Sequence, residues 1–240
     1  MIFSQSELAE MLKNPESYTT PPKSINFRET DSSYLFEGDE WLYKIKKEGN
    51  EFPTLAVKEA YCHEESKLSN SFNPNWNSTV LTILENNGAI KIGATKGEPV
   101  EYALKMKNLP EHLLLSRLLE NNSVSKNNIK DIAGRISEIH SSNPAKDKAA
   151  ESGKSESFRA LCDDMLFQMK RYFDASMTQP ILDMIRHPLE KFIDQNKRLF
   201  NKRYQKARIV HGHGAFLPEH IFVSDKFVHF ISPQEVHRKL

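Results

Sequence analysis

Residues 211–221 have the sequence HGHGAFLPEHI, and this stretch decides the fold that we expect for the chain. An apolar segment follows it, residues 221–231, which is interrupted by the polar triplet Ser224-Asp225-Lys226. Two short apolar runs on either side of a polar turn are typical of paired strands. The stretch therefore predicts a loop rich in glycine and histidine that leads into two short strands.

The composition is that of an ordinary folded chain. Of its 240 residues, 38% are hydrophobic, which is enough for one substantial core or two modest lobes. Lys and Arg number 33 and Asp and Glu number 32, so the net charge is +1. Such a balance gives no general attraction to nucleic acid, and we predict no nucleic-acid partner.

Three further features predict a cytoplasmic protein without a membrane partner. No apolar run approaches the roughly 18 residues that a membrane-spanning helix needs. The first residues are partly acidic and polar, where a signal peptide needs an uninterrupted apolar centre. Cys62 and Cys162 lie far apart and form no paired-thiol motif, which is typical of unpaired thiols in a reducing compartment.

The apolar spacing divides the chain into a β-rich part and a helical part. Ser4 and Glu7 have the spacing of a capping box, which predicts a short opening helix. From about residue 25 to residue 106 the apolar runs are short, which predicts an antiparallel sheet interrupted by one helix near Val57 to Leu68. The strand candidates are Tyr34–Phe36, Trp41–Ile45, Thr79–Leu84, Ala89–Ile92 and Tyr102–Met106.

Beyond Pro110 the apolar residues recur at three- and four-residue intervals, which predicts helices. Residues 143–157, rich in Ser, Lys and Ala, are predicted as a loop. The fold class is therefore α+β. In the strand at Trp41, alternation places Lys44 on one face and Tyr43 and Ile45 on the other.

A series of blocks occurs along the chain in an order that matches one known family. The blocks are Ser33–Asp39, Tyr43–Lys47, Cys62–Glu65, Gly97–Pro110, Leu114–Leu119, Ile129–His140, Gly212–Gly214 and Glu219–Ile221. Together they resemble the bacterial aminoglycoside-phosphotransferase-like predicted kinases, over most of residues 30–235. The resemblance implies one protein-kinase-like domain over residues 1–240. Its small antiparallel N-lobe covers about 25–108, its hinge lies near 106–109, and its helical C-lobe, 110–240, is shortened.

The resemblance also implies a nucleotide site in the N-lobe. Lys44 matches the lysine that holds the α- and β-phosphates of ATP. Glu65 matches the carboxylate that pairs with this lysine, with Glu64 as a close competitor. Met106 begins the hinge, whose backbone groups would hydrogen-bond an adenine edge. From the residues alone, a solvated strand lysine and a solvent-facing helical glutamate remain open alternatives.

The same resemblance shows where the catalytic acids are missing. Ala215 stands at the position of the aspartate that accepts the substrate proton, and Ser232 stands at that of the metal-binding aspartate. General-base assistance is worth on the order of 10²–10⁴ in rate, and the metal-binding acid neutralises phosphate charge. We therefore expect weak magnesium binding or none, and no ordinary phosphoryl transfer. In the degenerate loop His213 and His220 remain, and His213 would pack and hydrogen-bond backbone.

Two substitutes for the missing acids stay open. Glu235, alone or with His220, offers one carboxylate and one imidazole, a poor set for magnesium. The second is a transition-metal site from imidazoles, which suit zinc, copper or nickel. Its ligands would be His211, His213 and His220, helped by His229 or His237.

Three functional hypotheses follow. The first is an inactive kinase-like domain that retains weak ATP binding or binds a protein. The second is an active ATP-dependent small-molecule phosphotransferase that uses substitute residues, and the third is a non-functional remnant. A shortened C-lobe would leave apolar faces uncovered, so we also expect a protein partner or a homo-oligomer to cover them.

Overall fold

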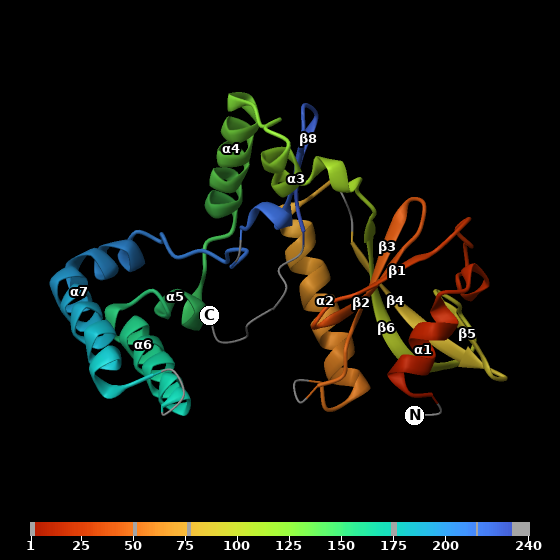
Figure 1. Ribbon diagram of the computed structural model, residues 1–240, viewed down its shortest axis with the longest axis horizontal. Coiled ribbons are helices and arrows are strands. Elements are labelled where there is room, and N and C mark those ends of the chain that lie inside the picture. Colours follow the sequence, from red (N-terminus) through yellow and green to blue (C-terminus); the bar gives the residue numbers. More distant parts are fainter. Residues whose placement is uncertain (1–2, 50–51, 76–77, 174–176, 215, 232–240) are drawn as a thin grey trace. The chain divides into compact units, whose positions relative to one another are not determined.

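The computed structural model describes residues 3–49, 52–75, 78–173, 177–214 and 216–231. The chain divides into two compact units, which are described separately. Unit 1 consists of Met1–Arg135 and His213–Val236, and unit 2 of Ile136–Gly212 and His237–Leu240 (Figure 1). Unit 1 holds the N-terminal sheet together with described residues 109–135 and 213–231 other than 215.

Unit 1 contains a six-stranded antiparallel sheet with the strand order β1-β2-β3-β6-β4-β5. The predicted antiparallel sheet is therefore confirmed. Its first strand, β1, was not among the predicted strands, because Phe27 is its only apolar residue. The strands are β1 (Asn26–Glu29), β2 (Ser33–Glu37), β3 (Trp41–Lys46), β4 (Thr79–Asn86), β5 (Ala89–Ile92) and β6 (Glu98–Lys107).

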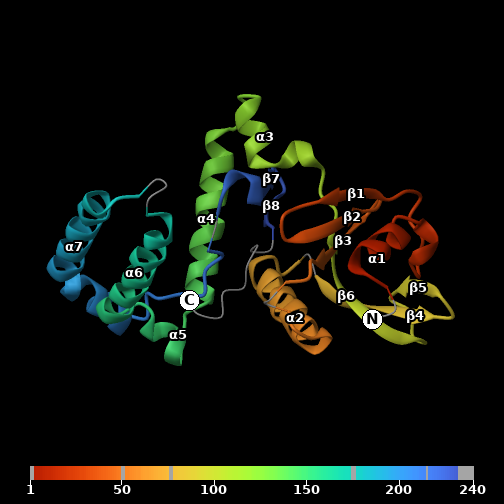
Figure 2. The same ribbon diagram turned by 60° about the horizontal axis from the view of Figure 1, so that its bottom comes forward.

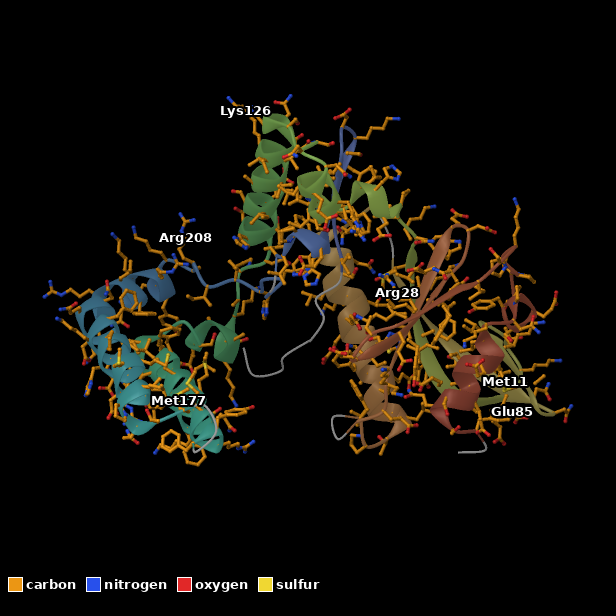
Figure 3. The ribbon with its side chains drawn as sticks, in the orientation of Figure 1. Met11, Arg28, Glu85, Lys126, Met177 and Arg208 are labelled. Atoms are coloured by element: carbon orange, nitrogen blue, oxygen red, sulfur yellow. The ribbon has the colours of Figure 1, made fainter. Side chains whose placement is uncertain are left out.

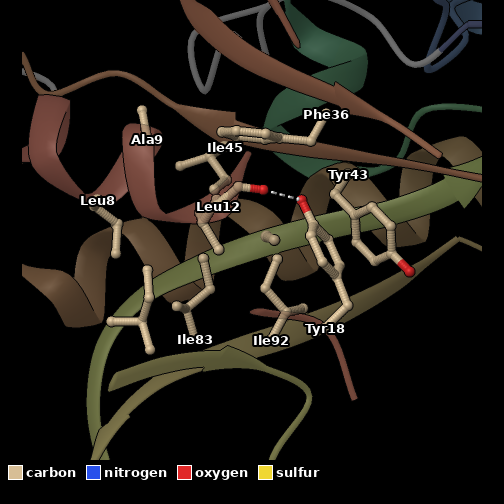
Figure 4. Packing of buried hydrophobic residues seen from close by; sticks show 11 residues of the cluster. Leu8, Ala9, Leu12, Tyr18, Phe36, Tyr43, Ile45, Ile83 and Ile92 are labelled. Carbon is tan, nitrogen blue, oxygen red and sulfur yellow. Dashed lines mark hydrogen bonds between the residues drawn. The ribbon is translucent and has the colours of Figure 1, made fainter. Parts of the chain in front are cut away.

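One face of the sheet packs against the opening helix, α1 (Gln5–Leu12). The helix begins where predicted, because Ser4 and Glu7 form a complete capping box. Its buried residues join Phe36, Ile45 and Ile83 in the main apolar core (Figure 4). Within this core the Tyr18 hydroxyl donates to the Leu12 carbonyl at 2.9 Å, and burial raises the pKa of Tyr18.

The long helix α2 (Leu55–Phe72) packs on β4 and β6 and confirms the predicted helix in the sheet region. Thr54 caps it by accepting a hydrogen bond from the Val57 N–H. Its buried residues recur at three- and four-residue intervals and include charged side chains. They are Lys58, Tyr61, Cys62, Glu65, Ser66, Ser69 and Phe72. Burial raises the pKa of the Cys62 thiol to about 12, so this thiol stays protonated.

The rest of unit 1 contains helices and the predicted hairpin. The helices are α3 (Leu115–Glu120) and the start of α4 (Lys126–Ser142). The hairpin is β7 (Ile221–Ser224) paired antiparallel with β8 (Phe227–Phe230), which confirms the two predicted strands. Among the described residues, unit 1 also contains the 3₁₀ turns η1 (Pro15–Ser17), η2 (Glu111–Leu113) and η4 (Pro218–His220), and η3 (Lys170–Tyr172) belongs to unit 2.

Unit 2 is helical and is organised around α6 (Ser155–Met169) and α7 (Gln179–Gln205), which pack together (Figure 2). Leu166, Leu182 and Ile193 are buried, and the rings of Phe158 and Phe200 stack at 5.3 Å. The predicted loop at residues 143–157 is wrong in part, because it contains the short helix α5 (Asp147–Glu151) and the first turn of α6. Two consecutive alanines favour a helix there.

No helix within the described ranges is both long and apolar enough to cross a membrane. The longest, α7, carries charged residues along its whole length and a proline, Pro188, in its interior. The predicted division of the chain into a β-rich and a helical part is confirmed at the level of an α+β architecture with an antiparallel sheet in its N-terminal part and helices in its C-terminal part.

Candidate functional site

A buried ion pair joins β3 to α2. The Lys44 ammonium lies 2.6 Å from a Glu65 carboxylate oxygen, and the two side chains are 11% and 1% exposed. Alternation along β3 produces this pairing, because Tyr43 and Ile45 enter the core beneath α1 and Lys44 points to α2. The pairing predicted for Lys44 and Glu65 is therefore present, whereas Glu64 is exposed.

The same helix supplies a second buried ion pair that the sequence did not indicate. Lys58 on α2 lies 2.5 Å from Glu101 on β6, and their side chains are 5% and 3% exposed. Glu101 also accepts hydrogen bonds from the Gln5 side chain and the Tyr102 backbone, at 3.1 and 2.9 Å. Lys58 and Glu65 lie seven residues apart, which places them on one helical face, but nothing in the sequence singles out Glu101.

The predicted hinge begins inside a strand. Met106 belongs to β6, where it lies opposite Leu42 as Leu104 lies opposite Lys44. The Asn108 N–H donates to the Glu40 carbonyl at 2.9 Å. In an antiparallel ladder, hydrogen-bonded pairs alternate with pairs that are not hydrogen-bonded. The backbone N–H and C=O of Met106 therefore point toward β3, and those of Lys107 point away from β3.

This register shows which backbone groups of the hinge range are free of strand pairing. The Met106 side chain lies on the same face of the sheet as Lys44. The backbone N–H and C=O of Lys107 are free to meet a ligand, because β4 begins at Thr79, opposite Lys105, and does not reach Lys107. The Asn108 side chain fixes the end of β6 by donating to the Gly38 carbonyl at 2.8 Å. Lys107 lies within the hinge predicted at residues 106–109, and the contact of its backbone with a nucleotide stays a prediction.

The histidine-rich loop enters unit 1 at His213, whose ring is buried. Its Nε2 contacts the Ile231 carbonyl, and its ring stacks on Phe216 at a centroid distance of 4.7 Å. Phe72 at the end of α2 lies 5.6 Å from the same ring. The packing role expected for His213 is therefore confirmed.

Asn73 connects α2 to the hairpin and was missed by sequence reasoning. Its buried side chain donates to the Phe230 carbonyl at 2.7 Å and accepts from the Phe230 N–H at 2.9 Å. The side-chain amide thus pairs with both backbone groups of Phe230, as a neighbouring strand would, and fixes the position of β8 relative to the end of α2. Asn73 is also the C-cap of α2, a position that asparagine sometimes takes, and only the folded contact reveals its role at β8.

Two further histidines of the hairpin region are buried. His220 is in η4, and its carbonyl accepts from the Ile231 N–H at 2.9 Å. His229 is in β8, and burial lowers its pKa to about 4, so the imidazole is neutral at physiological pH. His211 belongs to unit 2.

The remaining predicted site residues, Ala215, Ser232, Glu235 and His237, lie outside the described residues. Within the described residues, no group of three or more His, Cys, Asp or Glu side chains is arranged to hold a metal ion. The acidic substitute and the histidine metal site therefore stay predictions.

Comparison with known proteins adds no family. No protein-family model matches the chain, and no curated protein matches its sequence. Its chemistry must be inferred from its own residues, and the Lys44–Glu65 pair is a predicted constellation whose members are in contact.

Proposed function

We propose that unit 1 is a kinase-like domain that binds ATP weakly and without a metal ion, and that does not transfer phosphate at an ordinary enzymatic rate. The observation that supports this proposal is the ion pair between Lys44 and Glu65. A lysine on a central strand, held by a helical carboxylate, is the arrangement that grips phosphates in kinases.

The surroundings of Lys44 suit a nucleotide. Its side chain is 11% exposed, so the ammonium is held in place and still reachable. Leu104 and Met106 lie on the same face of β6 and offer apolar contacts for a purine ring, and the peptide of Lys107 would meet its polar edge. An ammonium binds phosphate as a point charge.

The sequence supports the proposed lack of ordinary phosphoryl transfer. Ala215 and Ser232 carry no carboxylate, so neither the proton acceptor nor the magnesium ligand of the resembled family is present at its expected position. Without the metal, charge neutralisation of the triphosphate is left to Lys44. Binding should therefore be weak and indifferent to magnesium.

Thermal unfolding with ATP, in EDTA and in magnesium, tests the proposal. A rise in melting temperature that is equal in both buffers is expected. A rise that requires magnesium would support the active phosphotransferase instead. No rise in either buffer contradicts nucleotide binding and leaves the remnant or a protein-binding role.

Restoring the acids sharpens the test of inactivity. The double substitution Ala215→Asp with Ser232→Asp should introduce phosphoryl transfer from ATP that the unaltered chain and either single variant lack. Radiolabelled ATP with a panel of small hydroxylated acceptors measures this. Turnover by the unaltered chain at an ordinary enzymatic rate would overturn the proposal.

A second candidate function, protein binding, is supported by unit 2. Apolar side chains remain exposed in stripes along α6 and α7, including Phe167 at 62% and Met184 at 75%. The stripes also contain Leu161, Met165, Ile181, Ile185, Phe192 and Leu199. α7 also carries the basic residues Arg186, Lys191, Lys197, Arg198, Lys202 and Arg203, and Arg208 follows the helix (Figure 3).

We propose that a second copy of the chain covers these stripes. Light scattering over a hundredfold concentration range should show a dimer that dissociates when Phe192→Ser and Leu199→Ser are introduced. A monomer at every concentration would contradict self-association.

Cys62 and Cys162 are free thiols, in keeping with the cytoplasmic location that we propose.

A further inference from the structure

A cavity of about 600 Å³ opens in unit 1 where the chain passes from β3 into α2. Phe52, Pro53 and Leu55 line one side, and Val100 of β6 lines another. This volume and the mainly apolar lining are those of sites for small organic ligands. The cavity is distinct from the Lys44 site, because Lys58, which lines it, precedes Glu65 by about two helical turns.

The buried wall of the cavity holds a hydrogen-bond donor with capacity to spare. Lys58 lines the cavity with its side chain 5% exposed. An ammonium has three N–H donors, and among the described residues Lys58 uses one, toward Glu101 at 2.5 Å. Glu101 by contrast accepts from three donors, Lys58, Gln5 and the Tyr102 N–H. A ligand with an acceptor oxygen could take a hydrogen bond from one of the remaining N–H donors of Lys58.

The exposed edge of the cavity is acidic. Glu48 and Glu98 both line it and are exposed. Within the described part of the chain neither carboxylate takes part in an ion pair. Two acids at the opening favour a ligand that carries a positive charge on its outer side.

A β-bulge shapes the cavity wall. Ile83 lies opposite Glu101 and Leu84 lies opposite Pro99, so Val100 is the extra residue on β6. The bulge changes the alternation along β6, and Val100 and Glu101 both line the cavity. It follows Gly97, where a Cβ would lie 2.5 Å from the Glu85 carbonyl oxygen and φ is +138°, so only glycine fits.

We propose that this cavity binds a small zwitterion of the amino-acid type with an apolar side chain. The carboxylate accepts from Lys58, the ammonium faces Glu48 and Glu98, and the apolar side chain packs on Phe52, Pro53 and Val100. Each chemical feature of the ligand meets one feature of the cavity. The inference does not depend on the proposed nucleotide binding.

Three matched probes test the proposal on the full chain by ¹H–¹⁵N NMR titration. L-phenylalanine carries both charges, phenethylamine lacks the carboxylate, and 3-phenylpropionate lacks the ammonium. L-phenylalanine should produce saturable shifts at Phe52, Leu55 and Val100. The other two should bind at least about tenfold more weakly, because each loses a charge-assisted hydrogen bond. Absence of saturable shifts with L-phenylalanine, or equal affinity for all three probes, overturns the proposal.

A pair of exposed substitutions tests the acidic edge without disturbing the buried pair. Glu48→Gln with Glu98→Gln should weaken L-phenylalanine binding by about tenfold and leave 3-phenylpropionate binding undiminished. Glu10→Gln with Glu120→Gln changes the net charge equally at exposed acids elsewhere and should leave both affinities unchanged. Equal weakening by both double variants, or by neither, contradicts the assigned position of the ligand ammonium.

Discussion

The two buried ion pairs of α2 differ in which element supplies the lysine and in how completely they are enclosed. Lys44 comes from a strand and keeps 11% of its side chain exposed, whereas Lys58 comes from the helix and keeps 5%. The Glu101 carboxylate accepts from three donors, whereas the Glu65 carboxylate pairs with the Lys44 ammonium of β3. A more enclosed pair depends more on its partner for solvation, so the Lys58 pair should matter more for stability and the Lys44 pair for binding.

The largest expected effect comes from breaking the enclosed pair. Lys58→Met leaves the Glu101 carboxylate buried without its counter-ion and should destabilise the fold by about 3–5 kcal/mol. Urea unfolding at neutral pH measures this. The double variant Lys58→Met with Glu101→Leu should recover much of the loss. A cost for Lys58→Met below about 1 kcal/mol would mean that the pair is open to water.

The second-largest expected effect is on the pH dependence of stability and comes from His229, a buried residue that stays neutral. His229 has its pKa lowered from 6.5 to about 4 by burial. As pH falls below 6.5 the unfolded chain binds this proton first, so stability present above pH 6.5 is lost progressively down to about pH 4. The full difference corresponds to about 3 kcal/mol. His229→Phe should make the stability of the variant depend less on pH across this window, and an unchanged pH dependence would show that His229 is not the titrating group.

Breaking the more exposed Lys44–Glu65 pair should reduce stability less than breaking the Lys58–Glu101 pair, and should weaken ATP binding more. Glu65→Gln removes a charge-assisted hydrogen bond from Lys44 and should cost about 2 kcal/mol of unfolding free energy. The matched control is Glu64→Gln, one residue earlier on α2 and exposed. Urea unfolding compares the two variants, and ATP-induced stabilisation should fall in Glu65→Gln alone. Equal effects of both substitutions would remove the special role of Glu65.

The smallest expected effect concerns a buried polar group without charge. Tyr18→Phe removes the hydrogen bond from the Tyr18 hydroxyl to the Leu12 carbonyl and should cost about 1 kcal/mol. Differential scanning calorimetry measures it. A cost equal to that of Lys58→Met would show that charge contributes nothing special to the enclosed pair.

The sequence predicted most of the fold because its periodic signals are local. The capping box of α1, the alternation in β3 and the hairpin around Ser224 are each visible within a few residues. β1 was missed because its apolar content is a single Phe27, and its strand character comes from pairing with β2. α5 was missed because serine and lysine around it resemble a loop.

The candidate site was predictable only where a resemblance supplied the pairing. Lys44 and Glu65 lie 21 residues apart, and no spacing rule joins a strand lysine to a helical glutamate. Glu101 and Asn73 were missed for the same reason: their partners, Lys58 at 43 residues and Phe230 at 157 residues, meet only in the folded chain. The sequence could not show which backbone groups within residues 106–109 are free of strand pairing, because this depends on register, which a sequence does not display.

The central claim is that Lys44, held by Glu65, binds the phosphates of ATP without a metal ion. Calorimetric titration of ATP into the unaltered chain and into Lys44→Met, both in EDTA and in magnesium, tests it most directly. We expect saturable heat in the unaltered chain that is the same in both buffers and is lost in Lys44→Met, with the variant still showing a cooperative thermal transition. Binding that appears only with magnesium, or that persists undiminished in Lys44→Met, would contradict the claim.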